Sequence, residues 1–110
     1  MKQILGKFPD RHGIVRMIDS FQFRSYFFIV FELLEINLYR YIKDPTFTGM
    51  KKENLRQIAT QMLHGLSHLK KIGIIHCDLK PENIMFTDST RSTVKIVDFG
   101  SACTDYKQGF

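Results

Sequence analysis

The stretch IIHCDLKPENIMF, residues 74–86, constrains this chain more than any other segment, because it holds polar side chains at fixed spacing between two apolar runs. It follows the pattern H-x-D-x-K-x-x-N, in which Asp78, Lys80 and Asn83 occupy the last three marked positions. Asp98 opens the tripeptide D-F-G fifteen residues after Asn83. The runs NIMF and TVKIV between them, joined by TDSTRS, predict a β-hairpin. Because a hairpin brings its two flanking segments close together, we expect Asp78, Asn83 and Asp98 to converge.

Three oxygen-bearing side chains that converge in this way can perform phosphoryl chemistry. Asn83 and Asp98 suit Mg²⁺, which is usually held by one or two carboxylates together with substrate phosphates. Asp78 is then free to orient a hydroxyl group and accept its proton, while Lys80 can offset charge on a transferring phosphoryl group. The alternative interpretation is that these are ordinary turn and cap residues, and that Lys80 and Glu82 form a solvated loop face.

The rest of the chain predicts an α+β fold without internal repeats. Two β-prone runs, residues 14–21 and 26–33, read as a hairpin, and the Phe-rich second run is expected to be a core strand. A short helix follows around residues 37–44, and a longer one is predicted over residues 51–71, ending at Gly73. The longer helix carries one apolar stripe, formed by Leu55, Ile58, Ala59, Met62, Leu66 and Leu69.

Composition narrows the class of protein. The formal charge of +5 comes from Lys and Arg residues dispersed along the chain, which fits a phosphate-bearing ligand and gives no indication of a nucleic-acid partner. No apolar run approaches the roughly 18 residues of a membrane span, and the first residues lack a signal-peptide core. We therefore expect an intracellular protein, cytoplasmic or nuclear, that does not bind membranes.

Apart from Asp78, Asn83 and Asp98, the side chains that could bind a metal are few. Cys77 and Cys103 are too few for a disulfide framework or a four-ligand zinc site, which fits a reducing compartment. His64 and His68 lie four residues apart on the predicted helix, but no glutamate follows the first histidine as in a zinc protease. We interpret both histidines as solvent-facing.

The segment HCDLKPEN, followed by DFG at this separation, resembles the catalytic loop and metal-binding turn of protein kinases. Within that family the chain is most similar to the dual-specificity tyrosine-regulated kinases, in FELLEINLY, IIHCDLKPENI and VKIVDFGSAC. The resemblance runs essentially from end to end and implies a partial protein-kinase-like fold. Residues 1–31 would end the small lobe, 32–37 would form the hinge, and 38–110 would begin the large lobe and extend into the early activation segment.

The resemblance also implies an activity and a set of site residues. It implies transfer of the γ-phosphoryl group of ATP, with Mg²⁺, to Ser or Thr hydroxyls of a protein substrate, and in dual-specificity members to Tyr. Asp78 and Lys80 would be catalytic, and Asn83 and Asp98 would hold the metal. The nucleotide would contact the gatekeeper Phe31, the hinge residues Glu32, Leu33 and Leu34, Asn37 near the ribose, and Met85 and Val97 at the pocket floor.

Some parts of the family pattern have no counterpart in the printed sequence. The glycines nowhere give G-x-G-x-x-G, no glutamate precedes Glu32, and residues 1–7 resemble the end of the helix that follows the strand lysine. We therefore expect the chain to be the middle of a kinase domain and to phosphorylate no peptide by itself. Two alternatives remain open: a non-catalytic kinase-like binding module, and a small-molecule phosphotransferase, against which Lys80 and Pro81 argue.

Cys77 stands where many kinases have the arginine that grips a phosphorylated activation-loop residue. A cysteine cannot make that contact. Cys103 follows Asp98 by five residues, so the predicted hairpin should bring the two sulfur atoms close together. We hypothesise a reversible disulfide that joins the catalytic loop to the activation segment. The alternative is that Cys77 is simply a small, half-buried residue.

Overall fold

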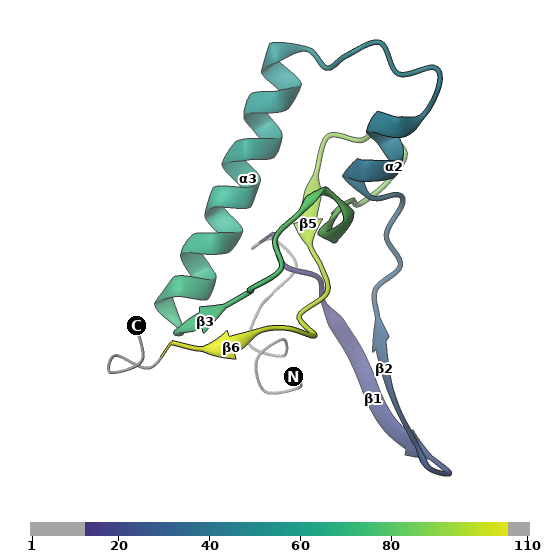
Figure 1. The fold of residues 1–110 in the computed structure, drawn as a ribbon, viewed down its shortest axis with the longest axis vertical. Coiled ribbons are helices and arrows are strands. Elements are labelled where there is room, and N and C mark those ends of the chain that lie inside the picture. Colours follow the sequence, from purple (N-terminus) through teal and green to yellow (C-terminus); the bar gives the residue numbers. More distant parts are fainter. Residues whose placement is uncertain (1–12, 106–110) are drawn as a thin grey trace.

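The computed structural model describes residues 13–105 of the chain, which form one long helix, one short helix and three antiparallel strand pairs (Figure 1). The predicted α+β class is confirmed. The predictions that concern residues 1–12 and 106–110 lie outside the described range. The elements are β1 (Met17–Phe23), β2 (Tyr26–Phe31), α2 (Leu38–Lys43), α3 (Lys52–Lys71), β3 (Ile74–Ile75), the 3-10 turn η2 (Pro81–Asn83), β4 (Ile84–Phe86), β5 (Val94–Ile96) and β6 (Cys103–Thr104).

The β1–β2 hairpin is present, but its predicted bounds, residues 14–21 and 26–33, are wrong. β1 begins only at Met17, because the preceding residues pair with β5: Ile14 bridges Ile96, and the Val15 amide donates to the Ile96 carbonyl over 3.0 Å. β2 ends at Phe31. The consequence is that residues 14–15 connect the hairpin to the second half of the chain.

β2 is a strand as predicted, but within the described residues it is not a core strand. Five of its six side chains are exposed, and only Ile29 is half-buried. Figure 1 shows the β1–β2 hairpin projecting from the part of the fold that contains α3 and β5. The cross-strand register places Phe21 opposite Phe28, and their rings stack with centroids 5.2 Å apart. The hairpin therefore presents aromatic side chains to solvent.

Both predicted helices are confirmed. The side chain of Asn37 caps α2 by accepting a hydrogen bond from the Arg40 amide, 2.7 Å away. α3 ends before Gly73, which adopts the left-handed conformation (φ +74°) that a residue with a Cβ rarely takes. Ile58 and Leu69 of the predicted stripe are buried, whereas Leu55 is 56% exposed. No helix within residues 13–105 is long and apolar enough to cross a membrane.

The core consists of two neighbouring apolar clusters that both include residues from one face of the β4–β5 hairpin, which forms as predicted. The side chain of Gln61 on α3 fixes this hairpin, since it donates to the Ser92 carbonyl over 2.9 Å and accepts from the Val94 amide over 2.7 Å. One cluster contains Ile14, Val15, Leu69, Ile74, Ile96 and Phe99, and the other contains Ile58, Ile84, Phe86 and Val94. A hairpin that packs against the core on one face and is hydrogen-bonded to α3 holds the segments that flank it in defined positions.

Candidate active site

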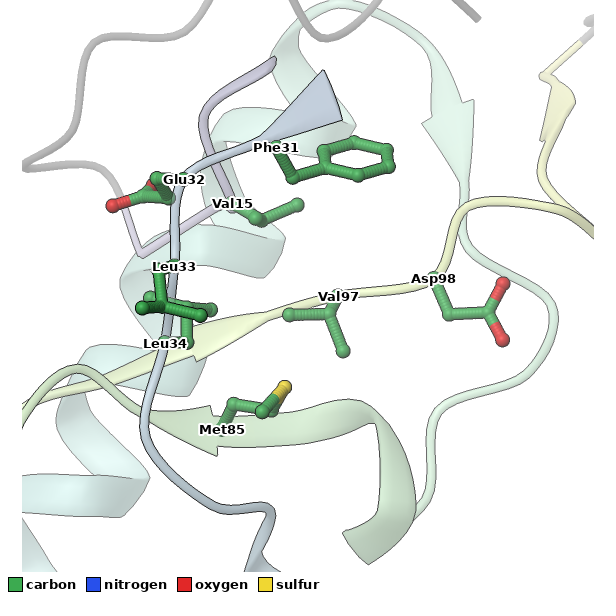
Figure 2. A pocket seen from close by; sticks show the side chains of 8 residues that line it. All are labelled: Val15, Phe31, Glu32, Leu33, Leu34, Met85, Val97 and Asp98. Carbon is green, nitrogen blue, oxygen red and sulfur yellow. The ribbon is translucent and has the colours of Figure 1, made fainter. Parts of the chain in front are cut away.

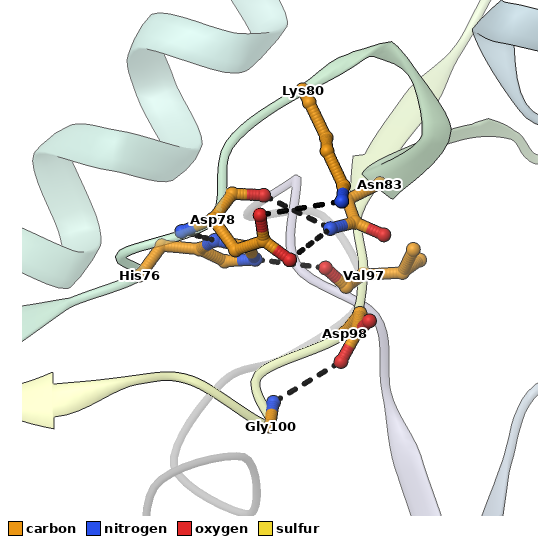
Figure 3. A network of polar contacts seen from close by, with 7 residues as sticks. All are labelled: His76, Asp78, Lys80, Asn83, Val97, Asp98 and Gly100. Atoms are coloured by element: carbon orange, nitrogen blue, oxygen red, sulfur yellow. Dashed lines mark hydrogen bonds and ion pairs between the residues drawn. The ribbon is translucent and has the colours of Figure 1, made fainter.

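His76 connects the loop before the β4–β5 hairpin to the loop after it (Figure 3). Its ring is 4% exposed. The Asp78 amide donates to Nδ1 over 3.1 Å, so Nδ1 carries no proton and Nε2 donates to the Val97 carbonyl, 2.8 Å away. No role was predicted for this histidine from the sequence, although it opens the H-x-D motif.

Asn83 lies directly beside Asp78, as expected from the hairpin. Its buried amide nitrogen donates to the Asp78 backbone carbonyl over 2.9 Å and to the carboxylate oxygen Oδ2 over 3.3 Å. Its own backbone carbonyl accepts from the Val97 amide over 2.9 Å, which brings the start of the D-F-G turn next to it. Because the amide nitrogen faces Asp78, the amide oxygen is the atom that remains to coordinate a cation.

Asp98 follows immediately and has an exposed carboxylate (Figure 3). Its backbone is left-handed (φ +61°), and Oδ1 accepts from the Gly100 amide over 3.2 Å. Within residues 13–105 no three His, Cys, Asp or Glu side chains are grouped to hold a metal. A Mg²⁺ ion here would therefore rely on Asp98, the amide oxygen of Asn83 and the phosphates of its nucleotide. The donor set fits that ion.

Lys80 and Glu82 are both exposed, as the solvated-loop interpretation predicted. Lys80 nevertheless has a specific partner, since its ammonium lies 3.4 Å from Oδ1 of Asp78. Both side chains of this pair are well exposed, so the contact stabilises the fold little. Its consequence is local: a positive charge lies next to the Asp78 carboxylate.

A cavity of about 240 Å³ lies beside this polar cluster and ends at Asp98 (Figure 2). Six residues that the kinase resemblance assigned to the nucleotide line it: Phe31, Glu32, Leu33, Leu34, Met85 and Val97. Asn37 does not line it; its side chain caps α2 and its backbone bridges to Met85. Val15 also lines the cavity, and the sequence analysis missed it because residues 14–15 were assigned only to a strand.

The two histidines of α3 differ in exposure. His64 is exposed as predicted, whereas His68 is half-buried, so its predicted solvent-facing position is wrong. His68 lies near the end of the helix, where β3 and Leu69 pack. Neither histidine belongs to a metal-binding group within the described residues.

Cys77 and Cys103 are both exposed and free, with their sulfur atoms 3.4 Å apart. The alternative of a half-buried Cys77 is therefore wrong. β3 and β6 bring the sulfurs together, because Ile75 pairs with Cys103, and Cys77 then adopts a left-handed backbone (φ +72°). The hydrogen bond with Cys77 raises the pKa of the Cys103 thiol above its ordinary value.

This geometry predicts that a peroxide oxidises the two thiols to an intramolecular disulfide, with reduction of the peroxide to water or an alcohol and water. Because the pKa of Cys103 is raised and the thiolate is the reactive form, the rate should increase as the pH rises from neutral into the alkaline range. Non-reducing peptide mass spectrometry measures the product, with Cys77→Ser and Cys103→Ser as controls. Oxidation that yields only sulfinic acids or intermolecular disulfides would contradict the hypothesis.

The fold is consistent with part of a protein kinase domain, and the sequence profile described as protein kinase domain matches residues 2–109. The chain belongs to the protein kinase family. Its curated relatives are of the dual-specificity tyrosine-regulated type, which confirms the resemblance seen in the sequence.

Three relatives illustrate the extent of similarity. Serine/threonine-protein kinase ppk15 of Schizosaccharomyces pombe is 48% identical over 94 residues, which cover 86% of this chain and 18% of that kinase. The dual specificity protein kinase YAK1 homolog of Arabidopsis thaliana is 48% identical over 99 residues, which cover 89% of this chain and 10% of that kinase. Dual specificity tyrosine-phosphorylation-regulated kinase 3 of Homo sapiens is 44% identical over 105 residues, which cover 93% of this chain and 18% of that kinase. The chain thus spans less than a fifth of the length of these relatives.

Proposed function

We propose that this chain carries the nucleotide pocket and catalytic loop of an ATP-dependent protein kinase that phosphorylates Ser and Thr hydroxyls, and Tyr in a dual-specificity mode. One observation supports this most strongly. Asp98 belongs both to the apolar cavity and to the polar loops that hold Asp78 and Asn83, so a base-binding surface ends where a metal-binding pair begins. A nucleotide has the same order of parts, from base to phosphates.

The adenine ring would occupy the cavity. Its volume of about 240 Å³ is below the roughly 300–1,000 Å³ of pockets that enclose a whole drug-sized ligand, which suits a base with its ribose and phosphates outside. Phe31, Met85 and Val97 supply apolar contact on the faces of the ring. The backbone of residues 32–34, at the start of the hinge, would supply the hydrogen bonds that orient it.

The polar loops would act on the phosphates and on the acceptor. Mg²⁺, when bound, neutralises phosphate charge during transfer. Asn83 and Asp98 hold the ion, and Asp78 orients the acceptor hydroxyl and accepts its proton. Lys80 offers its ammonium beside Asp78, where it offsets negative charge on the transferring group. His76 positions both loops through its bonds to Asp78 and Val97.

A non-catalytic kinase-like binding module is the second candidate, because a nucleotide could bind in the cavity without any catalytic role for Asp78. The presence of Asp78 and Asp98 together with Asn83 argues against a non-catalytic module, because nucleotide binding alone does not require a general base. The two candidates share nucleotide binding and differ in phosphoryl transfer, so binding and turnover must be measured separately.

Binding of Mg-ATP and of adenosine to the full-length protein encoded by the gene tests the proposed pocket. Asp98→Asn should weaken Mg-ATP binding about tenfold, a typical cost for disturbing a metal site, and leave adenosine binding unchanged. Asparagine tolerates the left-handed backbone at this position, so folding should survive. Calorimetry at fixed Mg²⁺ measures both affinities. Equal losses for the two ligands, or no loss for either, would contradict the assignment of Asp98 to the metal.

A further inference from the structure

Lys95 on β5 is a lysine with little contact with solvent, and its ammonium lies against the carboxylate of Glu32. Nζ is 2.8 Å from Oε1 and 2.7 Å from Oε2, and the two side chains are 7% and 15% exposed. Lysine and glutamate are seldom buried unless they are paired. The pair therefore forms a specific connection between β5 and residue 32, which are 63 positions apart in sequence.

Glu32 is held from a second side by Arg16. The Glu32 amide donates to the Arg16 carbonyl over 3.0 Å, and Oε2 accepts from the Arg16 amide over 2.6 Å. Figure 2 shows the Glu32 carboxylate pointing away from Phe31 and Val97. The side chain thus fixes the backbone from outside the cavity and leaves the cavity open to a ligand.

Lys95 also connects the backbone at Glu32 to the end of the cavity at which Asp98 lies. It pairs with Met85 across the hairpin, so both side chains lie on the same face, and Val97 follows on that face two residues later. Met85 and Val97 line the cavity, and Asp98 comes next. β5 and the two residues that directly follow it therefore carry the partner of Glu32, part of the floor of the cavity and the carboxylate at its far end.

We propose that Lys95 is a positioning residue for the nucleotide: it holds Glu32 so that the backbone of residues 32–34 faces the base at a fixed distance from Asp98. This inference rests on the proposed function. Stability alone is a weaker explanation, because a buried ion pair is often no more stabilising than apolar side chains of similar size. Without Lys95, the buried carboxylate loses its counter-charge and turns toward water, which displaces the backbone that follows Phe31.

The pair between Glu35 and Arg91 offers a matched control. It connects the same segment to the same hairpin three residues further on, with Nη2 of Arg91 2.9 Å from Oε1 of Glu35, and it lowers the pKa of Glu35. Both residues lie outside the cavity, and the Glu35 amide independently donates to the Phe86 carbonyl over 2.8 Å. Removing this more exposed pair should leave the hinge backbone in position.

Steady-state kinetics of the full-length protein test the proposal. Lys95→Met should raise the KM for ATP about tenfold and change kcat by less than about twofold, because ground-state binding is lost while the catalytic loop is intact. Lys95→Arg, which keeps the charge, should restore most of the affinity. Arg91→Met should change neither constant. A variant that merely folds poorly lowers the concentration of active enzyme, which reduces the apparent kcat without changing KM.

The double variant Glu32→Gln with Lys95→Met separates positioning from stability. It leaves no buried charge, so its thermal stability should recover relative to Lys95→Met, whereas its KM for ATP should stay high because the connection is still absent. An unchanged KM in the single or the double variant overturns this inference alone. A wild-type protein that neither binds nor uses ATP overturns the proposed function, and this inference with it.

Discussion

The full-length protein with Asp78→Asn is expected to lose peptide phosphorylation by about a thousandfold, within the range attributed to a general base. Asparagine has nearly the same size and keeps a side-chain oxygen where Oδ2 of Asp78 accepts from Asn83. The loop should therefore keep its shape while the acceptor hydroxyl loses the group that takes its proton. Initial rates with γ-labelled ATP and a basic peptide measure the effect.

Asp88→Asn is the control for this substitution. Asp88 lies in the turn between β4 and β5, at the end of the hairpin opposite the catalytic loop, and it is exposed. Its carboxylate accepts hydrogen bonds from the hydroxyl and the amide of Thr90, which lower its pKa. Activity should remain within about twofold of wild type, as for most surface substitutions. Equal losses of activity in Asp78→Asn and Asp88→Asn would contradict the catalytic role of Asp78.

The second large effect concerns solubility of the 110-residue chain expressed alone. One face of the β1–β2 hairpin carries exposed aromatic side chains, and exposed apolar patches of this kind lead to association. Among residues 13–105 no third strand pairs with this two-stranded sheet, so its edges add a site for strand pairing between molecules. We expect most of the chain in the insoluble fraction, and the remainder without a cooperative thermal transition. The face consists of Phe21, Phe23, Tyr26, Phe28 and Val30.

Substitutions at the tip of this hairpin test whether its exposed aromatic side chains cause the low solubility. Phe23→Thr with Tyr26→Thr removes two rings that are 59% and 67% exposed. Threonine favours β-strands, so the hairpin should still form. The stacked rings of Phe21 and Phe28 are unchanged. The soluble fraction after centrifugation should increase. Leu55→Thr on α3, where the leucine is 56% exposed, is the comparison for a single apolar residue outside the hairpin. A soluble, cooperatively unfolding wild-type monomer would contradict the expectation.

The parts of the fold that sequence predicted well have strong local signals. α3 has both a helical apolar period and Gly73 at its end, and the β4–β5 hairpin has two β-prone runs around a polar turn. The bounds of β1 could not be predicted, because residues 14–15 pair with Ile96, which lies far away in sequence. The β3–β6 pair has only two residues in each strand, so it depends on tertiary contacts rather than on propensity.

For the candidate site, too, features set by local sequence were predicted, whereas features that depend on distant contacts were not. Spacing predicted that Asp78, Asn83 and Asp98 would converge, since a hairpin imposes that proximity. It did not predict that His76 connects the loops, because that role depends on a carbonyl 21 residues away. Asn37 was assigned to the ribose, yet its side chain caps α2, a role for which asparagine is among the preferred residues.

Periodicity could not predict the exposure of β2. An alternating pattern shows which side chains share a face of a strand, but not whether another element covers that face. The buried Lys95 is the opposite case. It lies in a run of buried residues, and its ion pair with Glu32, which is distant in sequence, helps to accommodate a charged side chain there.

Phosphoryl transfer itself is the most direct test of the central claim that these loops and this cavity form a kinase centre. The full-length protein is incubated with γ-labelled ATP, Mg²⁺ and a basic peptide containing Ser, Thr and Tyr, and mass spectrometry identifies the acceptor. We predict label on a peptide hydroxyl with wild type, little with Asp78→Asn, and none with the 110-residue chain alone. Tight Mg-ATP binding without transfer would contradict the claim and indicate a binding module, and label found only on small-molecule acceptors would indicate a different phosphotransferase.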